Sequence, residues 1–121
     1  MGRRSTHNKI MKRAPNYDEV MALTEREVRI LTALAKGQMS GYEIGRQVEE
    51  DSGKQLKLSN GTLRPALERM HRFGVIEERG RDGSGPGSPA KMWRITSLGR
   101  MMLEWELSSY RRLVRLGEQR L

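Results

Sequence analysis

Hydrophobic residues recur at helical spacing in two short segments in the first half of the chain. The first opens with a capping-box pattern, Thr24 followed by Glu27, and its apolar positions repeat every three or four residues until Gly37. The second opens with the same pattern, Ser40 followed by Glu43, and ends in the turn sequence Asp-Ser-Gly. Its apolar residues are Tyr42, Ile44 and Val48. These patterns predict two short helices.

A third helix is predicted between Ser59, the expected N-cap, and Gly74, the expected terminator. Its first turn lacks large apolar side chains. Pro65 is expected within or near that first turn, where its missing N–H leaves no hydrogen bond unmade. The apolar stripe of this helix comprises Leu63, Ala66, Leu67, Met70 and Phe73.

Two β-type runs follow, residues 75–80 and 90–95, on either side of a connector rich in glycine, proline and serine. This arrangement predicts a hairpin. Trp93 and Ile95 share one face of the second strand and should point into the core. Thr96 is expected to cap a long final helix.

The final segment carries two apolar stripes, although a lone surface helix needs only one. The second stripe predicts a further contact, for which a second subunit is the simplest candidate. One stripe comprises Leu98, Met102, Trp105, Leu113 and Leu116, and the other Leu103, Leu107, Tyr110, Val114 and Leu121. The organisation expected is a basic, partly helical N-terminal arm, a central domain and a C-terminal dimerisation helix, at residues 1–22, 23–96 and 97–121.

Charge adds a partner class to this picture. The 121 residues include 23 Lys and Arg against 15 Asp and Glu, a formal net charge of +8. Such a charge favours polyanionic partners, of which nucleic acid is the commonest. Residues 23–60 hold equal numbers of basic and acidic side chains, so the excess lies in the N-terminal arm, in residues 61–95 and in the final segment.

Several function classes lack their signature residues. The chain has no cysteine, which excludes disulfides, thiolate zinc sites and cysteine nucleophiles and is typical of a reducing cytoplasm. No apolar run has the length of a signal peptide or a membrane span, so we expect a cytoplasmic protein without a membrane partner. No catalytic set or cofactor motif stands out, and the two histidines lack an acidic ligand pattern. We therefore expect neither an enzyme nor a cofactor or metal site.

Three helices followed by a hairpin is the order of a winged helix-turn-helix, a mainly α fold with a small β-hairpin (α+β). In this fold the third helix enters the major groove, and the hairpin lies along the backbone or the minor groove. The N-terminal end of such a helix approaches DNA closely, which favours small and polar residues there. The expected DNA contacts are Ser59, Asn60, Gly61, Thr62 and Arg64 on the helix, with Arg81 and Lys91 on the wing.

The chain resembles the PadR-like transcriptional regulators over about residues 24–103. The matching stretches are SGYEIGRQVEE at 40–50, LSNGTLRPALERMHRFGVIEE at 58–78 and WRITSLGRMML at 93–103. The resemblance implies a cytoplasmic repressor that dimerises through its C-terminal helix and binds a pseudo-palindromic operator in double-stranded DNA. It also implies release by a small hydrophobic or phenolic effector. Arg64 departs from the family, in which tyrosine is common at this position.

Other basic and aromatic residues keep two interpretations. Arg69, Arg72 and His71 favour solvated surface positions over DNA contacts, and Arg79 and Arg94 fit either role. Residues 80–88 lack the lysine and the strand-to-helix context of a phosphate-binding loop, which favours a wing tip. Trp105 and Tyr110 fit an effector pocket between subunits or plain packing. The alternative function is a winged-helix protein–protein interaction module without specific DNA binding.

Overall fold

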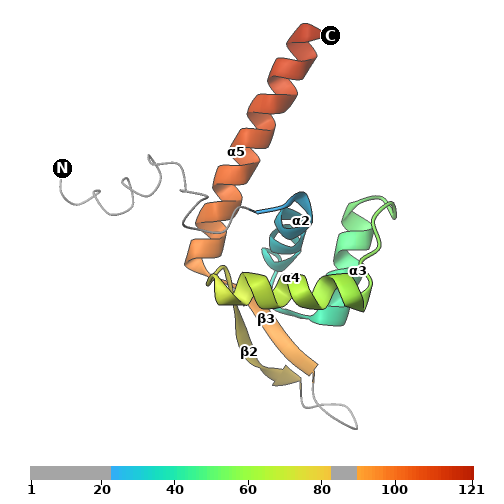
Figure 1. Cartoon of the computed structure of the whole chain (residues 1–121), viewed down its shortest axis with the longest axis vertical. Coiled ribbons are helices and arrows are strands. Elements are labelled where there is room, and N and C mark those ends of the chain that lie inside the picture. The colour runs from blue at the N-terminus through green and yellow to red at the C-terminus, as the bar shows by residue number, and fades with distance from the viewer. Residues whose placement is uncertain (1–22, 83–89) are drawn as a thin grey trace, which may run out of the picture.

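A computed structural model describes residues 23–82 and 90–121 of the chain, and it places a small antiparallel sheet among four helices (Figure 1). The expected N-terminal arm and most of the expected wing tip lie outside the described residues. Within these ranges no helix is long and apolar enough to cross a membrane. The elements are α2 (Glu25–Leu34), β1 (Met39–Ser40), α3 (Gly41–Asp51), α4 (Asn60–Arg72), β2 (Ile76–Asp82), β3 (Ala90–Ile95) and α5 (Ser97–Arg120).

The capping boxes place the first two helices where the sequence predicts them. The Thr24 hydroxyl accepts from the Glu27 N–H at 3.1 Å, and the Glu27 carboxylate accepts from the Thr24 N–H at 2.9 Å. Ser40 and Glu43 repeat the pair at the start of α3. The reciprocal bonds satisfy backbone donors that would otherwise have no partner at a helix N-terminus.

The first turns of α4 differ from the prediction in two ways. The Leu63 N–H already bonds the Ser59 carbonyl at 2.8 Å, so Pro65 lies inside the helical hydrogen-bond ladder and deprives the Gly61 carbonyl of its donor. The expectation that Pro65 costs no hydrogen bond is therefore wrong. Ser59 is the N-cap residue, but its hydroxyl donates to the Thr62 hydroxyl at 3.3 Å and accepts no backbone N–H.

The sheet has three strands in the order β1–β3–β2 rather than a hairpin alone. The antiparallel pairing of β2 with β3 is the predicted hairpin, with Ile76 opposite Ile95. A register shift between Glu78 and Arg81 interrupts it, next to Gly80 with φ 71°. Strand β1 pairs with β3 at Met39 and Ser40, too few residues to show a sequence period.

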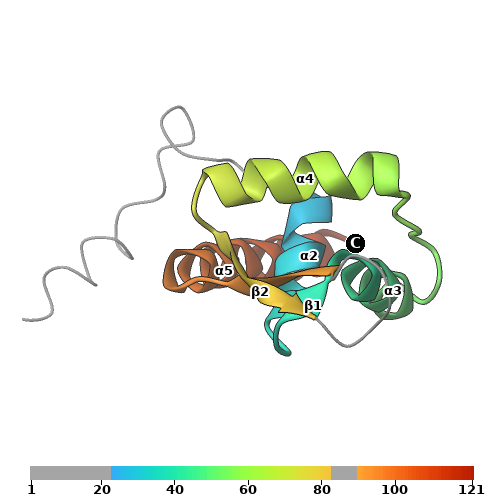
Figure 2. The same ribbon diagram turned by 90° about the horizontal axis from the view of Figure 1, so that it is seen from below.

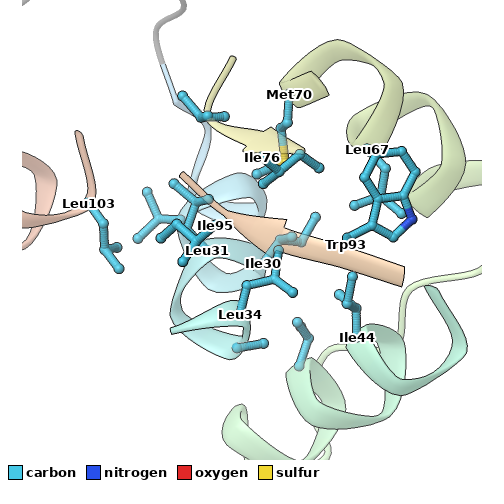
Figure 3. Close-up of a cluster of buried hydrophobic side chains, with 14 of the residues drawn as sticks. Ile30, Leu31, Leu34, Ile44, Leu67, Met70, Ile76, Trp93, Ile95 and Leu103 are labelled. Atoms are coloured by element: carbon cyan, nitrogen blue, oxygen red, sulfur yellow. The ribbon is translucent and has the colours of Figure 1, made fainter. Parts of the chain in front are cut away.

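One hydrophobic core joins all four helices and the sheet (Figure 3). Trp93 and Ile95 are buried in it, as predicted. Helix α4 forms one side of the molecule (Figure 2) and buries Leu67 and Met70. Two residues of the apolar patterns that predicted these helices lie at the surface, since Phe73 is 42% exposed and Tyr42 is 71% exposed.

Helix α5 contacts the domain through its residues up to Tyr110. Met102 and Leu103 are buried, and Leu107 and Tyr110 pack against the core from its edge. The rest of the helix extends beyond the other elements (Figure 1). Leu113, Val114 and Leu121 at this end are exposed, and Leu116 is half-buried. Leu113 is 66% exposed and Val114 57%. Both predicted apolar stripes of α5 thus extend beyond the part of the helix that packs against its own domain.

Gly99 sets the close approach of α5 to the start of β2. A Cβ at this position would lie 2.1 Å from the Val75 carbonyl oxygen and 2.9 Å from Ile95 Cγ1. The same carbonyl accepts from the Thr96 N–H at 3.1 Å, and the Thr96 hydroxyl donates to the Gly74 carbonyl at 2.6 Å. The first turn of α5 therefore packs directly against the backbone of Gly74 and Val75. Backbone atoms cannot move aside as a flexible side chain can.

We predict that Gly99→Ala lowers the free energy of unfolding by roughly 1–3 kcal/mol, because the added methyl group forces α5 away from Val75. The matched control is Gly117→Ala in the same helix, where a Cβ meets nothing within 4 Å. This change should be neutral or stabilising by up to about 1 kcal/mol, the helix preference of alanine over glycine. Urea titrations of the two variants measure the difference, and equal stabilities would contradict the close approach.

Candidate nucleic-acid interface

A groove runs along α4 from Asn60 to His71, bordered by the N-terminal end of α3 and by strand β3. Its volume is about 710 Å³. The sequence-predicted residues Asn60, Gly61, Arg64 and Lys91 all line this groove. Ser59 and Thr62 belong to the same end of α4, with Ser59 exposed and Thr62 half-buried. The structure thus brings the expected residues of the third helix together with one residue of the expected wing.

Gly61 leaves the backbone of α4 open at this end. A Cβ built on it would meet only the Ser59 hydroxyl, at 3.8 Å, which is ordinary contact. Its φ lies outside the left-handed region that favours glycine. Glycine inside a helix costs about 0.5–1 kcal/mol relative to alanine. Neither packing nor backbone geometry requires glycine at this position. The absence of a side chain therefore points to close contact with a partner molecule.

Trp93 forms part of the groove wall on the side of the wing. Its indole is buried, and the Lys91 ammonium lies 5.8 Å from the ring centroid. The His71 ring meets the indole edge-on at a centroid distance of 5.4 Å. These contacts hold a cation and an imidazole at the wall of the groove. Arg81 pairs with Lys91 in the strand register, and its side chain lies outside the part of the chain that the structure describes.

The arginines divide into structural and exposed ones. Arg69 forms an ion pair with Glu27, and its guanidinium carbon lies 5.8 Å from the Phe73 ring centroid. The expectation of a merely solvated Arg69 is therefore wrong. Arg94 bonds Glu77 across the hairpin, with Nε 2.8 Å from the carboxylate. The other arginines of α4 and β2 whose side chains the structure describes, Arg64, Arg72 and Arg79, are exposed.

The carboxylate of Glu27 connects the third helix to the first. Its side chain is only 4% exposed. Oε1 accepts from the Thr24 N–H, and Oε2 pairs with the Arg69 guanidinium. Both carboxylate oxygens are bonded, and these bonds offset the free-energy cost of removing the charge from water. The ion pair fixes how α4 is rotated against α2 and so which side chains face the groove.

Tyr42 is the groove residue that the sequence pattern misplaced. It reads as an apolar position of a short helix, yet it lines the groove beside Asn60 and Gly61. The guanidinium of Arg46, four residues later, lies 5.9 Å from its ring centroid. An arginine four residues after a tyrosine can reach its ring on a helix surface, but the same spacing fits a buried tyrosine, so the sequence does not decide where Tyr42 lies.

The two aromatic residues proposed for an effector pocket lie on different sides of α5. Tyr110 and Leu107 line a second cleft of about 500 Å³ together with Val28 and Thr32 of α2. Burial raises the pKa of the Tyr110 phenol, and the Glu106 carboxylate raises it further. Trp105 is half-buried and is not part of this cleft. Five residues separate the two along the helix, which turns 3.6 residues per turn, so one chain does not bring them together.

Helices α3 and α4 joined by a short loop, with α2 behind them and the β2–β3 hairpin beside α4, define a winged helix-turn-helix protein with an added C-terminal helix. Residues 30–105 match the Transcriptional regulator PadR-like family. This match spans more than half of the chain, and the chain belongs to that family. The resemblance seen in the sequence is thereby confirmed.

Solved structures support the same assignment. A PadR family transcription regulator from hypervirulent Clostridium difficile is 27% identical with a TM-score of 0.70, over 79% of this chain and 97% of that one. Bacillus subtilis PadR in complex with operator DNA is 29% identical with a TM-score of 0.59, over 66% of this chain and 45% of that one. A transcriptional regulator from Clostridium thermocellum, 18% identical with a TM-score of 0.67 over 81% of this chain and 97% of that one, shares the fold. No curated protein matched the chain.

We predict that Glu27→Gln lowers the free energy of unfolding by roughly 1–3 kcal/mol, because the Arg69 guanidinium loses its charged partner. The partial exposure of Arg69 keeps the loss below that of a fully buried pair. Glu25→Gln is the matched control, since Glu25 forms an exposed ion pair with Arg29 in the same helix. It should change stability by less than about 0.5 kcal/mol. Urea unfolding of both variants checks this, and equal losses would refute the structural role of Glu27.

Proposed function

We propose that this chain is a cytoplasmic, homodimeric transcriptional repressor that binds a pseudo-palindromic operator in double-stranded DNA. One observation carries the proposal. The open N-terminal end of α4, with Asn60, Gly61 and Arg64, and the wing lysine Lys91 border a single groove. Small and polar residues at the end of a helix, flanked by a cationic wing, suit the major groove and the adjoining backbone.

Within this proposal the groove residues have different roles. Arg64 is exposed and carries the two-pronged guanidinium that recognises a guanine edge, and Asn60 has the amide that recognises adenine. Thr62 supplies a further polar contact, while Ser59, Arg81 and Lys91 bind phosphates. The operator complex of Bacillus subtilis PadR supports DNA as the partner.

Dimerisation is proposed through α5, whose exposed Leu113 and Val114 need a partner surface. A two-fold dimer would present two copies of α4 to two half-sites of an operator. A small hydrophobic or phenolic effector is proposed to bind at the aromatic residues of this helix, Tyr110 in its cleft and Trp105 on the other side. Release of the operator would follow from a changed arrangement of the two subunits.

The decisive experiment is selection of bound fragments from genomic DNA, followed by titration of the selected duplex and an unrelated duplex at several salt concentrations. A palindromic sequence and a steep salt dependence are expected, because each neutralised phosphate contributes about 0.9 to the slope of log K against log salt. Failure to enrich any sequence, with binding to a protein partner instead, would favour a protein–protein interaction module.

We predict that Gly61→Val weakens operator binding at least tenfold, equivalent to about 1.4 kcal/mol, because a branched side chain blocks the approach of α4 to DNA. Stability should stay within about 0.5 kcal/mol of the parent, since valine has a better helix propensity than glycine and the site has space. Thermal melting and DNA titration of the same preparation separate the two effects. Unchanged affinity per folded molecule would remove Gly61 from the interface.

We predict that the double variant Leu113→Glu, Val114→Glu is monomeric and binds the full operator at least tenfold more weakly, about 1.4 kcal/mol, while its affinity for one half-site is unchanged. Both side chains are exposed, so the domain should still fold. Ser108→Glu with Gln119→Glu adds the same charge at polar positions of α5 and should remain dimeric. Sedimentation decides, and a dimeric Leu113→Glu, Val114→Glu variant would contradict this use of α5.

A further inference from the structure

An exposed tyrosine and an arginine stand together on α3 at the edge of the groove. Tyr42 is the second residue of α3 and is 71% exposed, so it contributes little to the core. Arg46 lies one turn later, and its Nη1 donates to the Tyr42 hydroxyl at 3.5 Å. The guanidinium also lies over the tyrosine ring. The two side chains therefore support one another on the surface.

The position of this pair widens the candidate interface beyond α4. Tyr42 lines the groove with Asn60, Arg64 and Lys91. It also lines a neighbouring hollow of about 760 Å³, to which Arg46 belongs. Tyr42 thus lies between the two hollows, with Arg46 on the side away from α4. In a helix-turn-helix, the helix before the recognition helix crosses the DNA backbone, which is where this pair would meet it.

The chemistry of the pair suits a phosphate. The Tyr42 hydroxyl accepts from Arg46, so its own proton stays available to donate. A guanidinium has five N–H donors, of which this bond engages one. A hydroxyl and a guanidinium side by side can bond two oxygens of one phosphate, and the charge strengthens both bonds. A phosphate contact positions the protein on the duplex without reading a base.

The carboxylates of α3 form no hydrogen bond or ion pair with Tyr42 or Arg46. The Glu43 carboxylate turns back to accept from the Ser40 N–H at 2.9 Å. Glu49 and Glu50 attract Arg46 through their charge and line the same hollow as Arg46, but they lie toward the C-terminal end of the helix and outside the groove. The N-terminal end of α3, where Tyr42 lies, is the end that favours an anion.

We propose that Tyr42 and Arg46 together bind a single DNA phosphate just outside the base pairs contacted by α4. The pair is a positioning contact that adds affinity for any duplex and leaves base preference to α4. This inference rests on the proposed function, because it requires that the groove receives DNA.

The test compares the full-length parent with Tyr42→Phe and Arg46→Gln, titrated with the selected operator and with an unrelated duplex. Tyr42→Phe removes only the hydroxyl and should weaken binding to both duplexes by roughly three- to tenfold. Arg46→Gln should weaken both by a similar factor and lower the salt slope by about 0.9. Arg64→Ala provides the contrast, since loss of a base contact should weaken the operator more than the unrelated duplex.

The matched control is Arg26→Gln, which removes the same charge from an exposed position. Arg26 lines a different hollow with Ser52 and Gln55, at the far end of α3. Its affinity and salt slope should equal those of the parent. Melting temperatures of all variants should agree, because each altered side chain is exposed.

Three outcomes would overturn the proposal. If the parent binds DNA while Tyr42→Phe and Arg46→Gln behave like Arg26→Gln, the pair has no phosphate contact and the proposed function still stands. If Arg46→Gln weakens only the operator, the pair reads sequence instead of backbone. If the parent binds neither duplex, the proposed function fails, and the pair loses its role with it.

Discussion

The buried Glu27 carboxylate is the interaction on which the arrangement of the groove depends. Taking a carboxylate out of water is costly unless its oxygens are bonded, and here one oxygen completes the N-terminus of α2 while the other holds Arg69 of α4. Helix α2 also carries Ile30 and Leu31, which are fully buried. Helix α4 is therefore held at a fixed rotation against the centre of the core. That rotation turns Leu67 and Met70 inward and leaves Asn60, Gly61 and Arg64 facing the groove.

A second fixed joint lies where α5 begins, next to the end of α4, since the Val75 N–H bonds the Met70 carbonyl. Gly99 brings the helix against the Val75 carbonyl, and Thr96 bonds the backbone on either side of the same turn. The start of α5 is thus held by backbone contacts as well as by its buried side chains Met102 and Leu103. For a dimer built on α5, this joint transmits the angle between subunits to the two grooves. The distance between the two half-sites would then depend on residues 96–99, a turn that contacts no base.

The sequence alone predicts what local chemistry determines. Two capping boxes mark the starts of α2 and α3, alternation places Trp93 and Ile95 in the core, and the N-terminal composition of α4 indicates the groove. Contacts distant in the sequence were missed. Glu27 and Arg69 are 42 residues apart, and the sequence predicts Glu27 only as a capping residue and Arg69 as a solvated charge. Strand β1 exists only because Met39 and Ser40 pair with β3. The exposure of Tyr42 does not follow from the sequence, because a tyrosine at helical spacing looks the same whether the helix buries it or exposes it.

The first and the later turns of α4 have different roles. The later turns hold the fold through Leu67, Arg69 and Met70, whereas the first turns bury Leu63 and expose Asn60, Gly61 and Arg64. Substitutions at the exposed polar positions should therefore change recognition with little effect on folding. Under gene duplication, copies of such a chain can diverge toward new operators through a few surface changes while the anchoring residues stay the same. A fold with this division is suited to generating many regulators from one scaffold.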